Sequence, residues 1–532
     1  MLDIVIKGGT VYDGTGRGCA RVDVGVKAGK IVCTGDLASE EAPLVIDATG
    51  KTVAPGFIDT HSHSDLRLFQ SPAPDVKLLQ GVTTEILGQD GLSVAPITDK
   101  DIPLFGKMLA GLLGEYDGDW PWRTTAEYLG TLDRHGLPLN VGYLVPHGPI
   151  RTRFMGMDDR HARAGEIDSM KSALGEALEQ GGAGFSTGLI YPPCSFAGED
   201  ELAGLCKVAA EHDLPFVVHM RNEGMRIRDS IDEMIRVARR SGVHLHISHL
   251  KVFGKSVWEA TGEVLAKLAA ARRDGVRITA DQYPYFAGCT VLMAVLPTWT
   301  LAGGTEALLA RLKDPATRDE LKKWFTMSEE SWDNRASIVG WDNVVVTWVK
   351  SEANKPAEGK SITEIARMRG ETPENTVLNL LVEENLAVTQ ITFYGTEETI
   401  TPFMQDPWVM ICTDGIYGGK PHPRLYGSFP RFIGRYVRGM RLMGMAEAVR
   451  KMTSLPASTF RLQGRGLIKE GYAADIVVFD QDTTVDNATF EEPTRTSTGV
   501  LWVLVNGCPV VEHGKCNGRT PGRAISYFPG PQ

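Results

Sequence analysis

The chain has 532 residues, of which 42% are hydrophobic and 23% charged, a composition ordinary for a soluble globular protein. Its net charge of −10 argues against a nucleic-acid partner, because binding to a polyanion requires a basic surface. No apolar run approaches the ~20 residues that span a bilayer, and the N-terminus resembles neither a signal peptide nor an anchor. The eight cysteines form no C-x-x-C pair and suit reduced thiols. We therefore expect a cytoplasmic protein that does not contact membranes.

Both ends of the chain predict β-structure. The first fifty residues alternate short β-rich runs with glycine-containing turns. The last seventy residues do the same, and Asn506-Gly507 is a good hairpin turn between two apolar runs. We expect residues 1–54 and 463–532 to form one small β-sandwich. Two unrelated β extensions are the alternative.

The central part alternates amphipathic helices with short β-branched runs, at intervals of roughly thirty residues. In the clearest case, the helical spacing of Glu166–Gln180 leads to the apolar run Ala183–Thr187. This pattern predicts a parallel sheet with crossover helices. There are enough such units for an α/β fold with a closed (β/α)8 TIM barrel over residues 55–462, and a doubly wound open sheet is the alternative. Residues 292–348 break the rhythm and are interpreted as an insertion that could cover the site.

Histidines at the ends of apolar runs indicate a metal site. His61 and His63 close the run that begins at Phe57, and their i, i+2 spacing puts both rings on one face of a strand. His219 and His249 are 30 residues apart, which is one βα repeat, so neighbouring strands would bring them together. Zinc prefers imidazole and carboxylate or thiolate ligands, and a catalytic zinc site keeps one position for water. We expect these histidines to be metal ligands.

Asp414 ends the apolar run that starts at Val409, the position of a site residue in a parallel sheet. A carboxylate there can bind metal and accept the proton of a water molecule, so Asp414 is the predicted catalytic base. The alternative is a turn aspartate before Gly415, which is a common pairing in loops.

Several longer motifs carry a resemblance to a known family. They are residues 56–63, 185–193, 219–223, 247–249, 281–285 and 421–424. With them the chain resembles the D-aminoacylase (N-acyl-D-amino-acid deacylase) family of the amidohydrolase superfamily, from Met1 to beyond Gly507. The resemblance implies a zinc-dependent TIM barrel with a β-sandwich, which hydrolyses the amide bond of N-acyl-D-amino acids.

The resemblance also implies how the metal ligands divide. His219 and His249 would hold a tightly bound zinc ion, while His61, His63 and Asp414 would surround a second position that is weaker or vacant. In this scheme Asp414 acts first as base and then as acid.

Substrate contacts follow from the same resemblance. Lys251, Tyr283 and Arg424 would bind the substrate carboxylate, and a guanidinium group suits bidentate recognition of a carboxylate. A solvated loop arginine is the alternative for Arg424. Tyr191, beside two prolines, would shape the pocket or simply pack.

Two residues depart from the family pattern. Members commonly carry Gly-Asn-Cys-Gly where this chain has Gly88-Gln89-Asp90-Gly91, so Asp90 replaces a metal-binding thiolate. A carboxylate is harder and can bridge two ions, which favours a binuclear centre or a divalent metal other than zinc. The alternative is that Asp90 only makes a turn. Cys289 stands where a serine is frequent, which puts one substrate hydrogen bond in doubt.

Thr290–Leu301 bears on side-chain preference because it contains no basic residue. Family members selective for acidic substrates place an arginine near this stretch, so we expect an apolar substrate side chain. The alternative is that the stretch only roots the insertion.

Two rival functions remain open. One is hydrolysis of a cyclic amide, a dipeptide or another non-peptide amide, as in relatives of dihydroorotase. Those enzymes commonly use a modified lysine on a mid-barrel strand, and Ala183–Leu189 contains no lysine. The other is a non-catalytic barrel kept for protein interaction, which is less favoured because every expected ligand is present. Assembly as a homo-oligomer is also left open.

Overall fold

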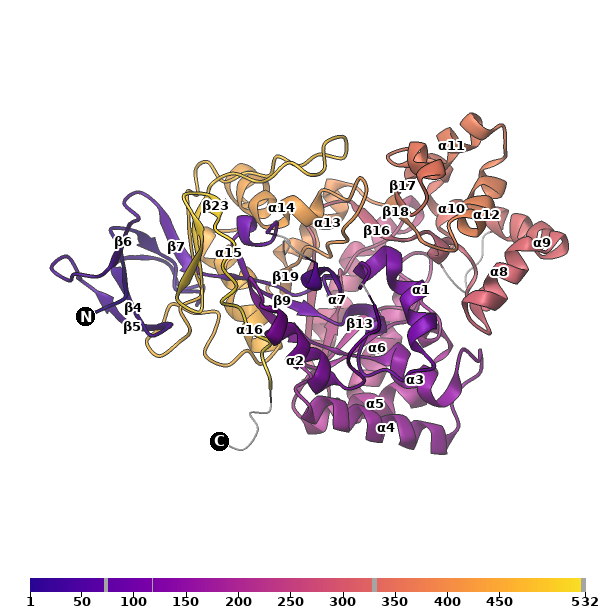
Figure 1. Cartoon of the computed structure of the whole chain (residues 1–532), viewed down its shortest axis with the longest axis horizontal. Helices are drawn as coiled ribbons and strands as arrows, with labels where there is room; N and C mark the ends of the chain where they lie inside the picture. The colour runs from indigo at the N-terminus through magenta and orange to yellow at the C-terminus, as the bar shows by residue number, and fades with distance from the viewer. Residues whose placement is uncertain (71–74, 117, 328–332, 528–532) are drawn as a thin grey trace.

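The computed structural model describes residues 1–70, 75–116, 118–327 and 333–527. Figure 1 shows three regions along the long axis of the molecule. Strands from both chain ends lie at one extremity, helices α8 to α12 lie at the other, and the parallel strands with their helices lie between.

The two chain ends share one sheet. Strand β20 (Ile476–Phe479) pairs with the N-terminal strand β7 (Thr52–Pro55) in antiparallel register, with Val477 opposite Ala54. The full seven-stranded order is β23 (Lys515–Cys516), β22 (Cys508–Glu512), β21 (Val500–Val505), β20, β7, β2 (Thr10–Val11) and β3 (Ala20–Arg21). The second sheet has the order β5 (Lys30–Gly35), β4 (Asp23–Lys27), β1 (Ile4–Lys7) and β6 (Leu44–Asp47). Residues such as Ile6 and Val478 pack in one core between them, which couples both ends of the chain.

The central strands pair in parallel. One sheet has the order β10 (Asn140–Tyr143), β9 (Val82–Leu87) and β8 (Phe57–Asp59). The other has the order β11 (Val145–Pro146), β12 (Phe185–Gly188), β13 (Pro215–His219), β14 (His244–Ile247), β15 (Ile278–Gln282) and β19 (Val409–Ile411). Leu144 alone separates β10 from β11, and Ser62 forms a parallel bridge with Gly415, just beyond β8 and β19. The two sheets are therefore continuous along the chain at Leu144 and approach each other again at the bridge between Ser62 and Gly415.

Amphipathic helices cover these strands. In α4, the residues Met170, Leu174, Ala177 and Leu178 recur at helical spacing and are buried. The helices of this region are α1 (Ile102–Leu113), α2 (Thr125–His135), α3 (His147–Met155), α4 (Ala164–Glu179), α5 (Glu199–Glu211), α6 (Ile227–Ser241), α7 (Thr261–Arg273), α13 (Glu397–Gln405), α14 (Arg424–Arg431), α15 (Met445–Met452) and α16 (Ser454–Thr459). The predicted helix Glu166–Gln180 thus lies within two residues of α4.

A separate antiparallel sheet interrupts the parallel pattern between β15 and β19. Its order is β16 (Ala287–Val291), β18 (Val388–Phe393) and β17 (Val344–Val349). The helices α8 (Thr305–Lys313), α9 (Pro315–Thr326), α10 (Arg335–Val339), α11 (Ile362–Arg369) and α12 (Pro373–Glu383) belong to the same region. The predicted insertion, residues 292–348, covers only part of it, because the return strand β18 ends at Phe393.

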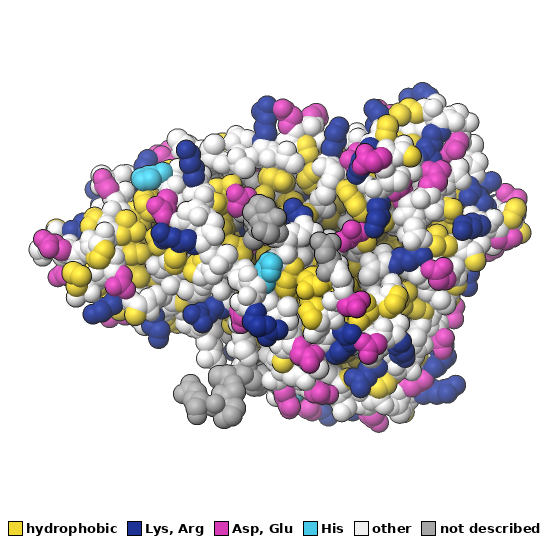
Figure 2. Space-filling model, in the orientation of Figure 1, with side chains coloured by type: hydrophobic (Ala, Val, Ile, Leu, Met, Phe, Trp, Pro, Cys, Tyr) yellow, Lys and Arg dark blue, Asp and Glu magenta, His cyan; other side chains and the backbone are white. Residues whose placement is uncertain are grey.

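Acidic and basic side chains are interspersed over the face shown in Figure 2, with apolar side chains between them. Across the described ranges, no helix combines the length and apolar character needed to cross a membrane.

Candidate metal centre and substrate pocket

The candidate ligands sit at the C-terminal ends of the parallel strands. His61 and His63 follow β8, and His219 is the last residue of β13. His249 and Asp414 follow β14 and β19. All of them are buried. Because parallel strands end at one edge, residues far apart in sequence converge there.

Asp90 lies at the centre of the histidines. Its Oδ1 is 3.8 Å from His61 Nε2 and 3.9 Å from both His219 Nδ1 and His249 Nε2. Its Oδ2 is 3.8 Å from His63 Nε2. Ligands that share one zinc ion at bonds of ~2.1 Å lie roughly 3.4 Å apart, so these separations suit atoms arranged around a common cation.

Asp414 completes the half of the cluster that contains His61 and His63. Its Oδ1 is 3.6 Å from His61 Nε2 and 3.2 Å from His63 Nε2. On the other half, His219 Nδ1 is 2.9 Å from His249 Nε2. Asp90 thus lies between two groups of donors.

The electrostatics of the cluster suit cation binding. Burial lowers the pKa of both His61 and His219 well below the usual range, which keeps these imidazoles neutral and able to act as ligands. Burial, with Asp414 and Glu223 nearby, raises the pKa of Asp90 to about 6. A buried carboxylate beside other acids is stabilised by a positive charge.

Several donor atoms in the cluster have no hydrogen-bond partner in the described part of the chain. They are His61 Nδ1 and Nε2, His63 Nδ1, Asp90 Oδ1 and His219 Nε2. Buried polar atoms normally find partners. Of these atoms, His61 Nε2 and Asp90 Oδ1 face each other at 3.8 Å without a hydrogen bond, which fits two ligands of one metal ion. Three overlapping sets of donor atoms lie close enough to share an ion: His61, His249 and Asp414; His61, His63 and Asp90; and Asp90, His219 and His249.

Three of these residues have an unusual backbone. The φ angles of Asp90, His249 and Asp414 are +59°, +36° and +50°. Residues other than glycine rarely adopt this left-handed conformation, and it clusters at functional sites. Gly88 begins the turn that carries Asp90. A glycine is required there, because at its φ of +76° a Cβ atom would lie 2.1 Å from the Leu144 carbonyl oxygen.

A pocket opens next to the ligands, and all five predicted substrate-contact residues line it: Tyr191, Lys251, Tyr283, Cys289 and Arg424. Arg424 is fully buried at the start of α14, so the alternative of a solvated loop arginine is wrong. Its guanidinium lies 4.4 Å from the ring centroid of Tyr283 and donates from Nη2 to the Cys289 carbonyl at 3.0 Å. Lys251 Nζ is 2.5 Å from Glu223 Oε1.

Residues 44–511 match the amidohydrolase family. The chain belongs to this family. It is 36% identical to the N-acyl-D-glutamate deacylase and 32% identical to the D-aminoacylase of Alcaligenes xylosoxydans xylosoxydans, over 98% of this chain in both cases and 96% and 97% of those proteins. The predicted membership of the D-aminoacylase family is confirmed.

A solved relative has the same overall structure. It is the N-acyl-D-glutamate deacylase of Bordetella bronchiseptica, in complex with zinc and a phosphonate inhibitor that mimics the tetrahedral intermediate. The alignment has a TM-score of 0.85 and 34% sequence identity, and it covers 99% of each chain.

In this amidohydrolase, Glu223 is a site residue that the sequence reasoning missed. Its Oε1 lies 3.2 Å from His249 Nδ1, and its Oε2 lies 3.6 Å from His219 Nε2. Burial would raise its pKa, but Lys251 and the neighbouring histidines together hold the pKa well below the usual range. Glu223 therefore stays ionised behind two candidate ligands, an arrangement that orients metal-binding imidazoles. Glu223 is the last residue of the motif 219–223, and this position is the sequence signal that could have identified it.

Two further acids support the strand ends. Asp281 accepts hydrogen bonds from the Thr60 hydroxyl at 2.7 Å and from the His249 amide at 2.5 Å, which fixes the backbone of a candidate ligand. Asp59 accepts a bond from the Thr413 amide at 2.8 Å and pairs with the buried amine of Lys77. These contacts hold the segments beyond β8, β14 and β19 in register.

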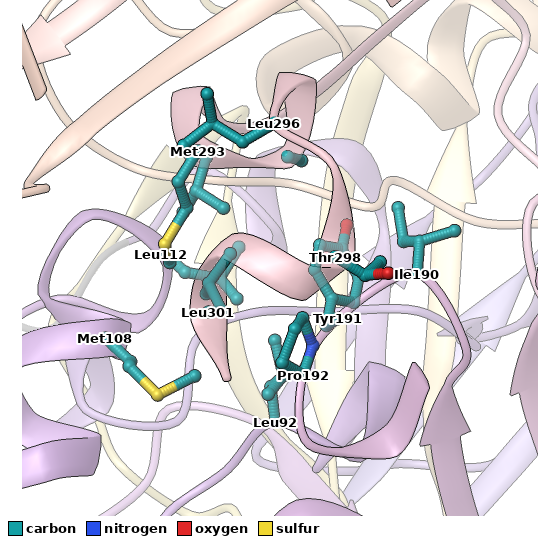
Figure 3. Close-up of a pocket in the computed structure, with 12 residues that line it drawn as sticks. Leu92, Met108, Leu112, Ile190, Tyr191, Pro192, Met293, Leu296, Thr298 and Leu301 are labelled. Carbon is teal, nitrogen blue, oxygen red and sulfur yellow. The ribbon is translucent and has the colours of Figure 1, made fainter. Parts of the chain in front are cut away.

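The stretch 290–301 borders an apolar pocket that adjoins the site. Met293, Leu296 and Leu301 face Met108, Leu112 and Pro192 across it (Figure 3). Leu112 and Tyr191 line both this pocket and the site pocket. The Tyr191 hydroxyl is 2.8 Å from Thr290 Oγ1, which holds the ring between the two spaces.

Arg335, at the start of α10, is the second residue that the sequence reasoning missed. It lines the site pocket together with the candidate ligands. No pattern in the sequence marked it, because it lies within the inserted region, far along the chain from the strand ends.

Proposed function

We propose that this amidohydrolase hydrolyses the amide bond of N-acyl-D-amino acids to a D-amino acid and a carboxylate. The observation that carries the proposal is the position of Asp414. Its carboxylate joins the histidine cluster and also faces a pocket lined by Lys251 and Arg424. Ligands, a proton acceptor and carboxylate-binding cations therefore share one space. The activities for which the two relatives are named support the same reaction.

The donor set fits Zn²⁺, as one ion or two, and another divalent metal is an option because of Asp90. His219 and His249 would hold one ion, His61, His63 and Asp414 would surround a second, and Asp90 would bridge them. When bound, zinc supplies Lewis-acid polarisation of the carbonyl and activation of water.

Asp414 is the proposed general base and acid. It accepts a proton from the attacking water and then delivers that proton to the leaving amine, so that one water is consumed for each amide broken. Burial would raise the pKa of Asp414, but its charged neighbours, with the Arg424 guanidinium the largest influence among them, hold the pKa well below the usual range. The base is thus ionised before reaction.

Lys251, Tyr283 and Arg424 are the proposed contacts of the substrate α-carboxylate, and Tyr191 and Cys289 shape the same pocket. The pocket in Figure 3 supports the predicted apolar side chain, because its lining is mostly apolar. The Cys289 thiol stays protonated, because burial raises its pKa to about 11.

The architecture is proposed as follows. The parallel strands from β8 to β19 would form a closed (β/α)8 barrel, supported by the bridge between Ser62 and Gly415. The two sheets of the chain ends would form a β-sandwich domain of residues 1–54 and 463–532. The inserted region would cover the open end of the barrel. Cytoplasmic location and any homo-oligomer stay predictions.

Hydrolysis of a cyclic amide, a dipeptide or another non-peptide amide is the second candidate. The observation that favours it is Asp90, which stands among the candidate ligands where the deacylases commonly carry a cysteine. The described strand β12 carries no lysine.

The deciding experiment measures primary-amine release from paired N-acetyl-D- and N-acetyl-L-amino acids with Leu, Met, Phe, Trp, Glu and Asp side chains. The assay contains Zn²⁺ or Mn²⁺, and Asp414→Asn is the control. Release from D substrates alone, lost in the control, is the expected result. Silence on both enantiomers by metal-loaded protein would favour the second candidate.

A further inference from the structure

Arg335 belongs to two spaces at once. It lines the site pocket and also an adjoining polar pocket, whose other residues include Ser195, Arg221 and Asp333. Only 4% of Arg335 is exposed. Its guanidinium lies 4.8 Å from the ring centroid of Phe253, which fixes the group at the boundary between the two pockets.

Arg335 differs from the other cations of the site pocket in its pairing. Lys251 is paired with Glu223 at 2.5 Å, and Arg424 with Asp414 at 2.9 Å. Within the described ranges, Arg335 has no ion pair or side-chain hydrogen bond, and its buried Nε, like the Nε of Arg424, is without a hydrogen-bond partner. A buried charge without a partner is costly, so this arginine is suited to an anionic ligand.

The neighbouring acid is already engaged. Asp333 accepts hydrogen bonds from the Glu223 amide at 2.7 Å and the Gly224 amide at 2.9 Å. Arg221, in the same polar pocket, is paired with Glu233 at 3.0 Å. In contrast, the buried Ser195 hydroxyl also lacks a partner among the described residues. Counting described residues alone, the polar pocket thus offers a cation without an ion pair and a hydroxyl without a partner, which are both donors to a carboxylate.

We propose that Arg335 binds a second carboxylate of the substrate, in addition to the α-carboxylate. This inference rests on the proposed deacylase function. An N-acyl-amino acid has two variable arms, the acyl group and the side chain, and two pockets of opposite character adjoin the site. When the amino-acid side chain occupies the apolar pocket, the acyl group is the part of the substrate that carries the second carboxylate. The substrate class is then an apolar D-amino acid that carries a dicarboxylic acyl group such as succinyl.

The test compares kcat/KM for three substrates: N-succinyl-D-leucine, N-acetyl-D-leucine and N-acetyl-D-glutamate. Wild type should prefer the succinyl substrate to the acetyl one, and Arg335→Met should lower that preference by about 10- to 100-fold, the usual worth of a charge-assisted hydrogen bond. Arg221→Met is the matched control, because it removes a cation of the polar pocket that is already paired. Arg335→Lys keeps the charge and should retain part of the preference.

The remaining results of this comparison either support or overturn the second carboxylate site. A preference for N-acetyl-D-glutamate that depends on Arg335 would support the second carboxylate site and show that the side chain is the anionic arm. An equal effect of Arg335→Met on all three substrates, or no effect, would overturn the proposal.

If wild type hydrolyses none of the substrates, the deacylase function fails. Calorimetric binding of N-succinyl-D-leucine to metal-loaded Asp414→Asn protein, with and without Arg335→Met, then still tests Arg335. Equal binding by both proteins would overturn the inference.

Discussion

The Arg424 guanidinium lies 2.9 Å from the Asp414 carboxylate, from Nη1 to Oδ2, and both side chains are buried. This contact occupies one carboxylate oxygen and leaves Oδ1 facing His61 and His63. Arg424 therefore does two things in the proposed mechanism: it keeps the base ionised, and it orients the free oxygen towards the ligand cluster.

We expect Arg424→Met to lower the free energy of unfolding by about 3–5 kcal/mol, because the substitution leaves Asp414 as a buried carboxylate without its partner. It should also reduce kcat/KM. Arg435→Met is the matched control, because the pair of Arg435 with Glu397 is on the surface and its loss should cost less than about 1 kcal/mol. Denaturant unfolding of both variants checks the difference, and equal destabilisation would contradict it.

Asp90→Ala should lower the metal content, because it removes the carboxylate that lies between the two halves of the cluster. Metal analysis of purified protein after dialysis is the measurement. Asp90→Cys should recover one tightly held zinc, since a thiolate is a good zinc ligand. His161→Ala, which changes a histidine outside the cluster, serves as control. Wild-type metal content in Asp90→Ala would reject the bridging role.

Glu223→Gln should weaken metal binding by ~10- to 100-fold, the usual cost of losing an acid that orients ligating histidines. The amide keeps the shape of the side chain but loses the charge that faces His249 and Lys251. Competition with a chromophoric chelator gives the metal affinity. Glu233→Gln, which removes the charge paired with Arg221, should leave that affinity as in wild type. A similar loss in both variants would point to general destabilisation instead.

The candidate ligands could be predicted because their positions follow from a repeated local pattern. His219 and His249 each end an apolar run, and parallel pairing brings such run ends to one edge whatever the loops do. The same rule located Asp414. The strands and helices around them, such as α4, were predicted for the same reason, since burial and helical spacing are local properties.

Glu223 and Arg335 could not be assigned in this way. Glu223 lies beyond the end of β13, and its role depends on the position of Lys251 on the next loop. Arg335 reaches the site only because the inserted region folds back over it, a tertiary arrangement that no periodicity records. The extent of the insertion was underestimated for a similar reason: β18 pairs with β16, a partner distant in sequence.

Lys451 provides a pH prediction away from the metal centre. Its amine donates to the Val409 carbonyl at 2.7 Å and to the Asp406 carbonyl, beside the strand that leads to Asp414. Burial lowers the pKa of Lys451 to about 7, from 10.5 for an unperturbed lysine. Between these two values the unfolded chain binds more protons at Lys451 than the folded chain does. The free energy of unfolding should therefore rise with pH in this window, by up to ~1.4 kcal/mol per pH unit.

Lys451→Met removes the titrating group and keeps a side chain of similar length, so the contribution of Lys451 to this rise should disappear. Denaturant unfolding of wild type and variant from pH 6.5 to 9.5 measures it. The difference in free energy of unfolding, wild type minus variant, should increase with pH across this range. The rise should be shallower at pH 6.5, where the amine is mostly protonated in both states. A difference that stays constant from pH 7 to 9.5 would show that Lys451 is charged in the folded protein, and that its two carbonyl partners solvate an ammonium group.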